Sequence, residues 1–127
     1  MQQRHIYNYA VIRVVPLVER EEFINVGVIL FCKKQKYIRV MAKMRDEMIL
    51  ALKPDAELDE IAANLEAFRK IAAGEKDGGP IAEMDVPERF RWLTAVRSAS
   101  IQTSRPHPGI SLNLDETLNN LFKEMVL

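Results

Sequence analysis

The sequence contains little that would place it outside the cell or in a membrane. Cys32 is the single cysteine among 127 residues, so no disulfide can form within the chain. The longest apolar run, residues 26–32, is far shorter than the roughly 20 residues that span a bilayer. The first residues lack the apolar core of a signal peptide. We therefore expect a cytoplasmic protein with no membrane contact.

An excess of charge is also absent. The 18 basic residues balance the 18 acidic residues, so no overall field draws the chain to nucleic acid or to anionic lipid. Charge is nevertheless segregated locally, which predicts a basic side and an acidic side of the molecule. The basic run comprises Lys33, Lys34, Lys36, Arg39, Lys43 and Arg45, and the acidic run comprises Asp55, Glu57, Asp59 and Glu60.

Common catalytic and cofactor motifs are missing. The chain has no phosphate-binding glycine loop, no dinucleotide fingerprint and no serine nucleophile elbow. His5 and His107 are the only histidines, and no metal-ligand spacing connects them. We therefore expect no metal and no cofactor. Whether the chain is an enzyme stays open, and the missing motifs favour a non-catalytic protein.

What is present predicts one folded α+β domain spanning residues 1–127. Hydrophobic residues make up 48% and charged residues 28%, which is ordinary globular usage. Residues 6–15, 23–33 and 37–42 are rich in β-branched and aromatic residues and predict strands. The last two are separated by a short lysine-rich turn and predict an antiparallel hairpin. We expect a small antiparallel sheet of three to four strands, with 100–104 as the fourth.

Helices are predicted in the middle and C-terminal parts of the chain, where they would cover the sheet. Apolar residues recur at helical spacing over 44–52 and again after Asp55, which we expect to cap a helix that ends at Gly74. Pro87 suits the first turn of another helix. Asn113 and Glu116 form a capping-box pattern that opens the last one. The glycine-rich segment 74–80 is expected to be a mobile surface loop.

Arg13 stands out on the first strand because regular alternation places it among apolar neighbours. A half-buried guanidinium needs partners. One interpretation pairs it with a carboxylate of the following connection, Glu19, Glu21 or Glu22, as a structural ion pair. The other interpretation presents its planar fork to a phosphate or carboxylate ligand.

Asn25 and Gly27 interrupt the apolar pattern of the second strand and, in a regular strand, share one face. Glycine inside a strand marks a bulge or the close approach of another backbone or of a ligand. Packing and a ligand-facing pocket therefore both remain open for Gly27. Asn25 is explained either by a neighbouring turn or by binding.

A second polar stretch runs from residue 97 to residue 109. It gathers hydroxyls, an amide, guanidiniums and an imidazole, and we take Arg97, Ser98, Gln102, Ser104 and His107 as further candidate binding residues. Pro106 and Pro108 restrict the backbone on both sides of His107 and would hold its imidazole in place. The alternative is a surface turn that carries an ordinary histidine.

These two stretches resemble the signature segments of a bacterial family, domain of unknown function 3037. The first segment is residues 9–16 together with residues 20–30. The second is residues 89–93 followed by Arg97-Ser98, Gln102, Ser104 and His107-Pro108-Gly109. The resemblance covers essentially the whole chain but implies no established activity. The resemblance further implies a neighbouring gene for a kinase-like protein of the HipA family, and with it an accessory role for this chain beside that partner.

Three functions follow as expectations. The first is a non-catalytic binding or accessory module in a protein complex, for which the chain could also form a homo-oligomer. The second is a small hydrolase or transferase on an anionic substrate, using Arg13, Arg97, His107 and Glu22. The third is a nucleic-acid binder that uses the basic hairpin 33–45.

Overall fold

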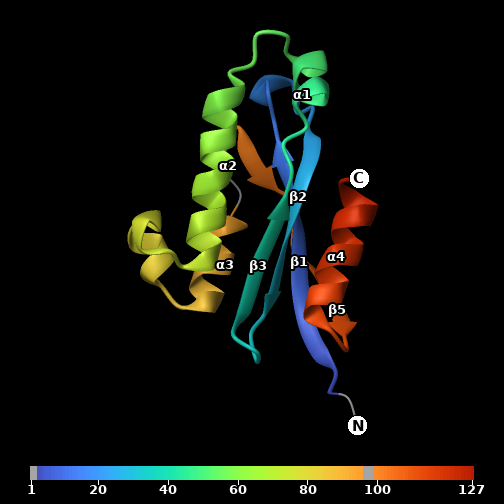
Figure 1. Cartoon of the computed structure of the whole chain (residues 1–127), viewed down its shortest axis with the longest axis vertical. Coiled ribbons are helices and arrows are strands. Elements are labelled where there is room, and N and C mark those ends of the chain that lie inside the picture. The colour runs from blue at the N-terminus through green and yellow to red at the C-terminus, as the bar shows by residue number, and fades with distance from the viewer. Residues whose placement is uncertain (1–2, 96–98) are drawn as a thin grey trace.

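The computed structural model describes residues 3–95 and 99–127 and confirms the α+β class. One antiparallel sheet runs through the centre, and helices cover both of its faces (Figure 1). The strands are β1 (His5–Val14), β2 (Ile24–Cys32), β3 (Tyr37–Ala42), β4 (Ile101–Thr103) and β5 (His107–Ser111). Their order is β3-β2-β1-β4, and β5 pairs with β1 as well.

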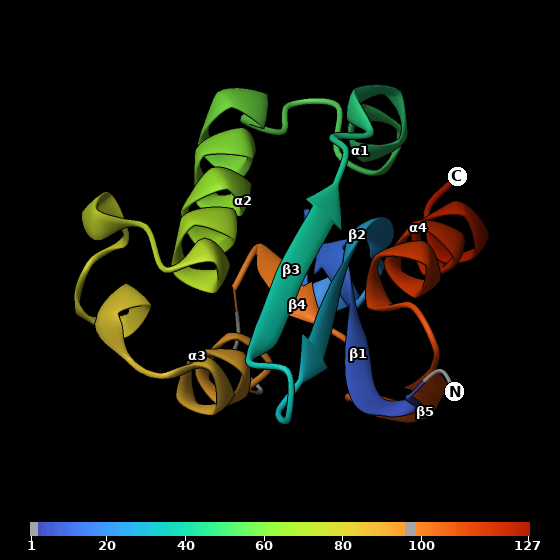
Figure 2. The same cartoon turned by 60° about the horizontal axis from the view of Figure 1, so that its bottom comes forward.

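The helices divide between the two faces (Figure 2). They are α1 (Asp46–Leu52), α2 (Leu58–Ala73), α3 (Val86–Leu93) and α4 (Leu114–Met125), with short 3-10 turns at Val18–Arg20, Lys76–Gly78 and Pro80–Glu83. Helices α1, α2 and α3 pack on one face and α4 on the other. Within the described residues, no helix is long and apolar enough to cross a membrane.

Two cores result because β2 is apolar on both faces. Ile29 and Phe31 of β2 pack with Leu65 and Phe68 of α2 on one side. On the other side, Val28, Leu30 and Cys32 pack with Leu114, Leu118 and Phe122 of α4. The helices that the sequence predicts from apolar periodicity therefore cover the sheet as expected.

The helix ends differ in part from the sequence prediction. Helix α2 begins at Leu58 after Glu57, so Asp55 does not cap it. Gly74 ends the helix in the left-handed conformation with φ 69°, as predicted. The segment 74–80, which we expected to be a mobile surface loop, contains one 3-10 turn at Lys76–Gly78 and leads into a second at Pro80–Glu83. Asn113 caps α4, and its side chain accepts a hydrogen bond from the Glu116 N–H at 3.0 Å.

A β-bulge in β2 contradicts the expectation that Asn25 and Gly27 share a face. Ile12 of β1 lies opposite Gly27, whereas the next residue, Arg13, lies opposite Asn25, so Val26 is the extra residue. The bulge puts Gly27 on the α2 face with Ile12 and puts Asn25 on the α4 face. A single inserted residue reverses the side on which every preceding side chain of the strand lies.

The second correction concerns His107, because residues 107–111 form a strand rather than a turn. Strand β5 pairs with residues 5–9 of β1, and β4 pairs with residues 12–14 along the same edge. Ser104 occupies the gap between the two short strands. Its N–H donates to the Val11 carbonyl, and its hydroxyl accepts from the Val11 N–H, both at 2.8 Å. Ser104 thus keeps the hydrogen bonding of β1 continuous across the interruption.

Replacing Ser104 by alanine is expected to lower the free energy of unfolding by about 1–2 kcal/mol. The hydroxyl is buried, and its loss leaves the Val11 N–H without an acceptor in the sheet interior. Urea denaturation measures the change. Ser100→Ala is the matched control, since among the described residues the Ser100 hydroxyl accepts only a long, exposed contact from Asn64 at 3.5 Å. Equal midpoints for the two variants would contradict this role of Ser104.

Candidate functional site

The two signature stretches meet on the sheet. Strands β4 and β5 both lie along β1, so Arg13 is flanked by Gln102 on one side and by Asn25 on the other. We call these three residues the Arg13 row. Residues opposite one another in an antiparallel ladder project to the same face, and for this row it is the face that α4 partly covers.

Arg13 has no acidic partner among the described residues, which contradicts the structural ion pair expected from the sequence. Its guanidinium carbon instead lies 4.0 Å from the centre of the Phe23 ring, in a cation–π contact. Its Nε is buried without a hydrogen-bond acceptor. Burial lowers the pKa of Arg13, because desolvation penalises the charged form and no carboxylate offsets it.

Glu22 does not reach Arg13. It pairs with Arg20 instead, and both of these side chains are largely exposed on the connection between β1 and β2. The connection turns at Glu21, which adopts a left-handed conformation with φ 57°. The local geometry therefore offers Phe23 to Arg13 and directs the acidic side chain to solvent.

Asn25 fastens the end of α4 to the sheet. Its Nδ2 donates to the Met125 carbonyl at 3.1 Å, and this carbonyl belongs to the last turn of the helix. Its Oδ1 is buried and has no donor. Arg13 and Asn25 are partners in the ladder between β1 and β2, and each carries one buried group without a hydrogen bond. The group on Arg13 is a donor, and the group on Asn25 is an acceptor. The row is therefore incompletely satisfied, which is typical of a place where a ligand or water completes the bonding.

A small pocket of about 380 Å³ opens beside the row. It is lined by Phe23, Ile24, Asn25, Arg45, Met48, Met125, Val126 and Leu127. Arg45 donates through Nη1 to the Val126 carbonyl. A cation at a helix C-terminus is favoured by the helix dipole, so Arg45 stabilises α4 while it also faces the pocket. Two guanidiniums, Arg13 and Arg45, consequently lie near Phe23 and Asn25.

The remaining candidates are spread along the sheet. Gln102 donates from Nε2 to the Ala99 carbonyl at 2.8 Å, and Ser104 serves the backbone of β1. His107 is exposed, lies opposite Tyr9, and has its ring centroid 5.4 Å from that of Tyr9. Tyr9 and Arg13 are four residues apart on β1, about 13 Å at the usual rise of a strand. His107 and Arg13 therefore do not form one hydrogen-bonded constellation.

Gly27 is explained by backbone packing. A Cβ atom at this position would lie 2.6 Å from the Met41 carbonyl oxygen and 3.0 Å from the Ala42 Cβ, both in β3. The close approach of β3 thus requires a glycine there without any ligand. Arg97 and Ser98 lie outside the described residues. In the parts of the chain that are described, no group of three His, Cys, Asp or Glu side chains gathers as a metal site would.

The aromatic residue of the basic hairpin is already engaged. The Tyr37 hydroxyl donates to the Asp115 carboxylate of α4 at 2.7 Å, and the Arg39 guanidinium carbon lies 5.5 Å from the Tyr37 ring centre. Burial and the bond to Asp115 raise the pKa of Tyr37. The ring therefore secures the hairpin to α4 and is poorly placed for stacking on a nucleic-acid base.

Sequence reasoning did not assign roles to Phe23 and Tyr9, the rings beside Arg13 and His107. The ring beneath Arg13 is 46% exposed, so one side of it faces solvent. The position of Phe23 directly after the acidic pair 21–22 was a visible signal, but only the strand register shows which of these side chains meets Arg13.

These contacts define a small α+β fold that presents an arginine on the face of its sheet, above an aromatic ring and beside a mainly apolar pocket to which Asn25 and Arg45 contribute polar groups. The chain belongs to the family described as "Protein of unknown function (DUF3037)", whose family model matches residues 9–126. The match covers nearly the whole chain and confirms the resemblance seen in the two signature stretches. Searches of curated proteins and of solved structures find no significant match.

Proposed function

We propose that the chain is a non-catalytic binding module of a bacterial cytoplasmic protein complex, and that Arg13 receives an anionic group of its partner. The observation that supports this most directly is an arginine held over Phe23 with a buried, unpaired Nε and no carboxylate among the described residues. Guanidiniums recognise carboxylates and phosphates through paired hydrogen bonds. A ligand anion would supply the acceptor that the fold does not.

The first candidate partner is a kinase-fold protein of the HipA type. Its support is the family resemblance, which implies that such a protein is encoded nearby. The exposed ring of Phe23 next to a guanidinium also suits a protein partner, because aromatic and arginine side chains dominate the binding energy of protein interfaces. An acidic or phosphorylated side chain of the partner would enter at Arg13, with its apolar neighbours against Phe23.

The enzymatic alternative has less support. It needs Arg13, His107 and Glu22 within hydrogen-bond reach of one substrate, yet Glu22 pairs with Arg20 and His107 lies beside Tyr9. The nucleic-acid alternative also loses one contact, because Tyr37 is engaged by Asp115 and Arg39. The lysines at the turn of the hairpin remain exposed and could still contact phosphates.

Co-expression tests the proposal. The tagged chain is produced together with the HipA-like kinase-fold protein, and the eluate is analysed by size-exclusion chromatography with light scattering at several salt concentrations. We expect a complex with the combined mass that weakens as salt rises, since the contact is charged. A cytoplasmic kinase of another family is the control. Elution of the free chain alone at every salt concentration would contradict the proposed partner.

A further inference from the structure

The outer edge of β3 has no neighbouring strand. The Lys43 N–H donates to the Val26 carbonyl at 2.7 Å, which sets the phase of the hydrogen bonds between β2 and β3. Because paired residues alternate, residues 37, 39 and 41 also bond to β2, whereas Ile38, Val40 and Ala42 direct their N–H and C=O groups outward. Within the described parts of the chain, no loop or side chain hydrogen-bonds to these outward groups.

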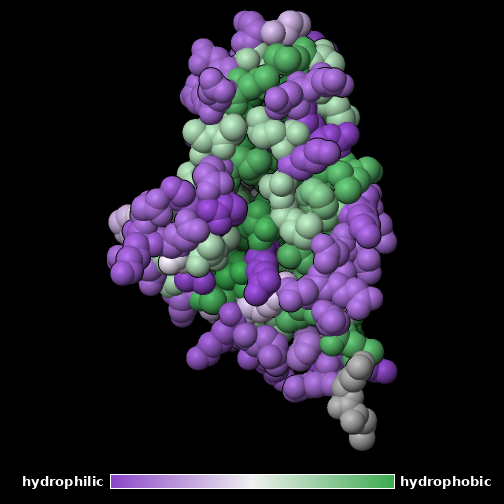
Figure 3. All heavy atoms as spheres, viewed as in Figure 1, coloured by the Kyte–Doolittle hydropathy of each residue, from purple (hydrophilic) through white to green (hydrophobic). Residues whose placement is uncertain are grey.

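A groove of about 660 Å³ follows this edge. Figure 3 shows apolar residues gathered between the helices in this region, with hydrophilic residues on both sides. The lining residues from β3 and the segment after it are Val40, Met41, Ala42, Lys43 and Met44; α2 contributes Ala62, Leu65, Glu66 and Arg69, and α4 contributes Phe122. The outward groups of β3 thus lie at a hollow whose walls belong to two helices.

The opposite edge of the sheet differs from β3. Strand β4 has three residues, and β5 carries Pro108, which cannot donate to a further strand. Strand β3 has six residues and no proline. Lysines and arginines along an edge also discourage pairing, but on β3 the basic side chains occupy one face only. Its other face carries Ile38, Val40 and Ala42, and the basic face has Tyr37 and Met41 beside Arg39, so the edge carries little charge for its length.

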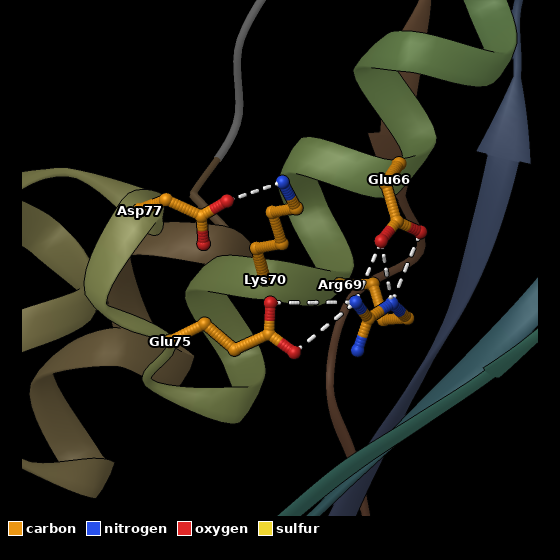
Figure 4. A network of polar contacts seen from close by, with 5 residues as sticks. All are labelled: Glu66, Arg69, Lys70, Glu75 and Asp77. Carbon is orange, nitrogen blue, oxygen red and sulfur yellow. Dashed lines mark hydrogen bonds and ion pairs between the residues drawn. The ribbon is translucent and has the colours of Figure 1, made fainter.

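The charge of the groove selects the occupant. Arg39 lies on the α4 side of β3, where its exposed side chain forms a long ion pair with Asp115 at 3.5 Å. Lys43 follows β3 directly and is exposed. On the α2 wall, Arg69 is already held by Glu66 at 2.6 Å and by Glu75 at 3.2 Å (Figure 4). The Arg69 guanidinium also keeps the pKa of Glu66 low, so this pair stays ionised near neutral pH. Among the described residues, the basic side chain of this region without an ion pair is therefore that of Lys43, directly after β3.

We propose that the edge of β3 binds an extended segment of a protein partner in which acidic and apolar side chains alternate. The segment adds a strand through the outward groups of Ile38, Val40 and Ala42. Its carboxylates lie beside Arg39 and Lys43, and its apolar side chains enter the groove toward Val40 and Leu65. A second copy of this chain fits less well, because its own Arg39 and Lys43 would join the same basic face.

This inference concerns a surface other than the Arg13 row and does not depend on it. The probe is a short blocked peptide in which glutamate and valine alternate, and a lysine–valine peptide is its charge-reversed control. Binding is measured by fluorescence anisotropy and by amide chemical shifts. We expect the acidic peptide alone to bind and to protect the amides of Ile38, Val40 and Ala42 from exchange. Arg13→Met should leave peptide binding unchanged. This variant therefore distinguishes a failure of the proposed β3 docking edge from a failure of the proposed anion site at Arg13.

Two matched variants locate the contact. Lys43→Glu is expected to weaken the acidic peptide about tenfold, because an attraction across the edge becomes a repulsion. Lys34→Glu makes the same change in charge at the hairpin turn and should have little effect. Val40→Pro removes an outward donor without removing a bond to β2 and should abolish binding, while circular dichroism checks its fold.

Three outcomes would overturn the proposal. One is equal binding, or none, of the two peptides. Another is equal weakening by Lys34→Glu and Lys43→Glu, which would mean unspecific attraction to the basic hairpin. The third is a dimer in analytical ultracentrifugation that Val40→Pro dissociates, because the occupant would then be a second copy of the chain.

Discussion

Gly27→Ala is expected to lower the free energy of unfolding by about 2–3 kcal/mol, a large fraction of the stability of a small domain. The new Cβ would lie 2.6 Å from the Met41 carbonyl oxygen. That atom belongs to the backbone of β3, which is held to β2 by the ladder, so relief requires the strands to separate locally. Urea denaturation measures the loss as a lower midpoint, provided that the dependence of the free energy of unfolding on urea concentration is unchanged.

Gly109→Ala provides the comparison. A Cβ there would lie 2.3 Å from the Tyr7 ring, which is a side chain and can be removed. We expect Tyr7→Ala to relieve most of the cost of Gly109→Ala in a double-mutant cycle. No neighbouring side-chain truncation, such as Ala42→Gly, should relieve Gly27→Ala to the same extent. A Gly27→Ala chain with the midpoint of the parent would contradict the close approach of β3.

The parts of the fold that the sequence predicts well are those fixed by local periodicity. The strand at 37–42, the hairpin and the helix that ends at Gly74 all follow from residues that are close in sequence. The bulge at Val26 could not be predicted in this way. It depends on which residue of β1 lies opposite Gly27, and that register is decided by packing across strands and not within β2.

Strand β5 was missed for a related reason. Two prolines and a glycine around His107 are typical of a turn, but a proline is tolerated at an edge where its position needs no donor. The ring of Tyr7 then covers Gly109 across the ladder. The pairing of β5 with β1 and the contact of Tyr7 with Gly109 both join residues about a hundred positions apart, so local propensity could not indicate them.

The environment of Arg13 was predicted in part. Alternation correctly placed it on a half-buried face, and three carboxylates at 19–22 made an ion pair the simplest expectation. The left-handed turn at Glu21 and the bulge together bring Phe23 to Arg13 instead. Backbone geometry that spans several residues, and not residue type, thus determined whether this arginine was neutralised within the fold.

The two proposed surfaces lie on different parts of one sheet. The Arg13 row crosses β4, β1 and β2, whereas the docking edge belongs to β3, at the other margin of β2. Asn25 and Arg45 bind the C-terminal end of α4. At the N-terminal end of the same helix, Asp115 accepts a hydrogen bond from Tyr37 of β3. Helix α4 is therefore fastened beside both surfaces, so a partner could contact both without any rearrangement of the sheet.

Arg13→Met is expected to separate binding from stability. Methionine can keep an apolar contact with Phe23, and its sulfur interacts favourably with aromatic rings, while the desolvation cost of an unpaired guanidinium disappears. The lost cation–π contact offsets this gain. We therefore expect the free energy of unfolding to stay within about 0.5 kcal/mol of the parent. Affinity for the proposed kinase-fold partner should fall roughly 10- to 100-fold, as for a lost charge-assisted hydrogen bond.

Arg20→Met is the matched control, because it removes the same charge from the neighbouring connection, where Arg20 is exposed and pairs with Glu22. Its effect on affinity should be below about twofold, as is usual for an exposed ion pair. Titration with inorganic phosphate, followed through the Nε–H signal of Arg13, gives a readout that needs no partner. If Arg13 only supports the sheet, the pattern is reversed: Arg13→Met lowers the free energy of unfolding and leaves the partner affinity unchanged. Phosphate would then not shift the Nε–H signal of Arg13, because a purely structural arginine has no anion to bind.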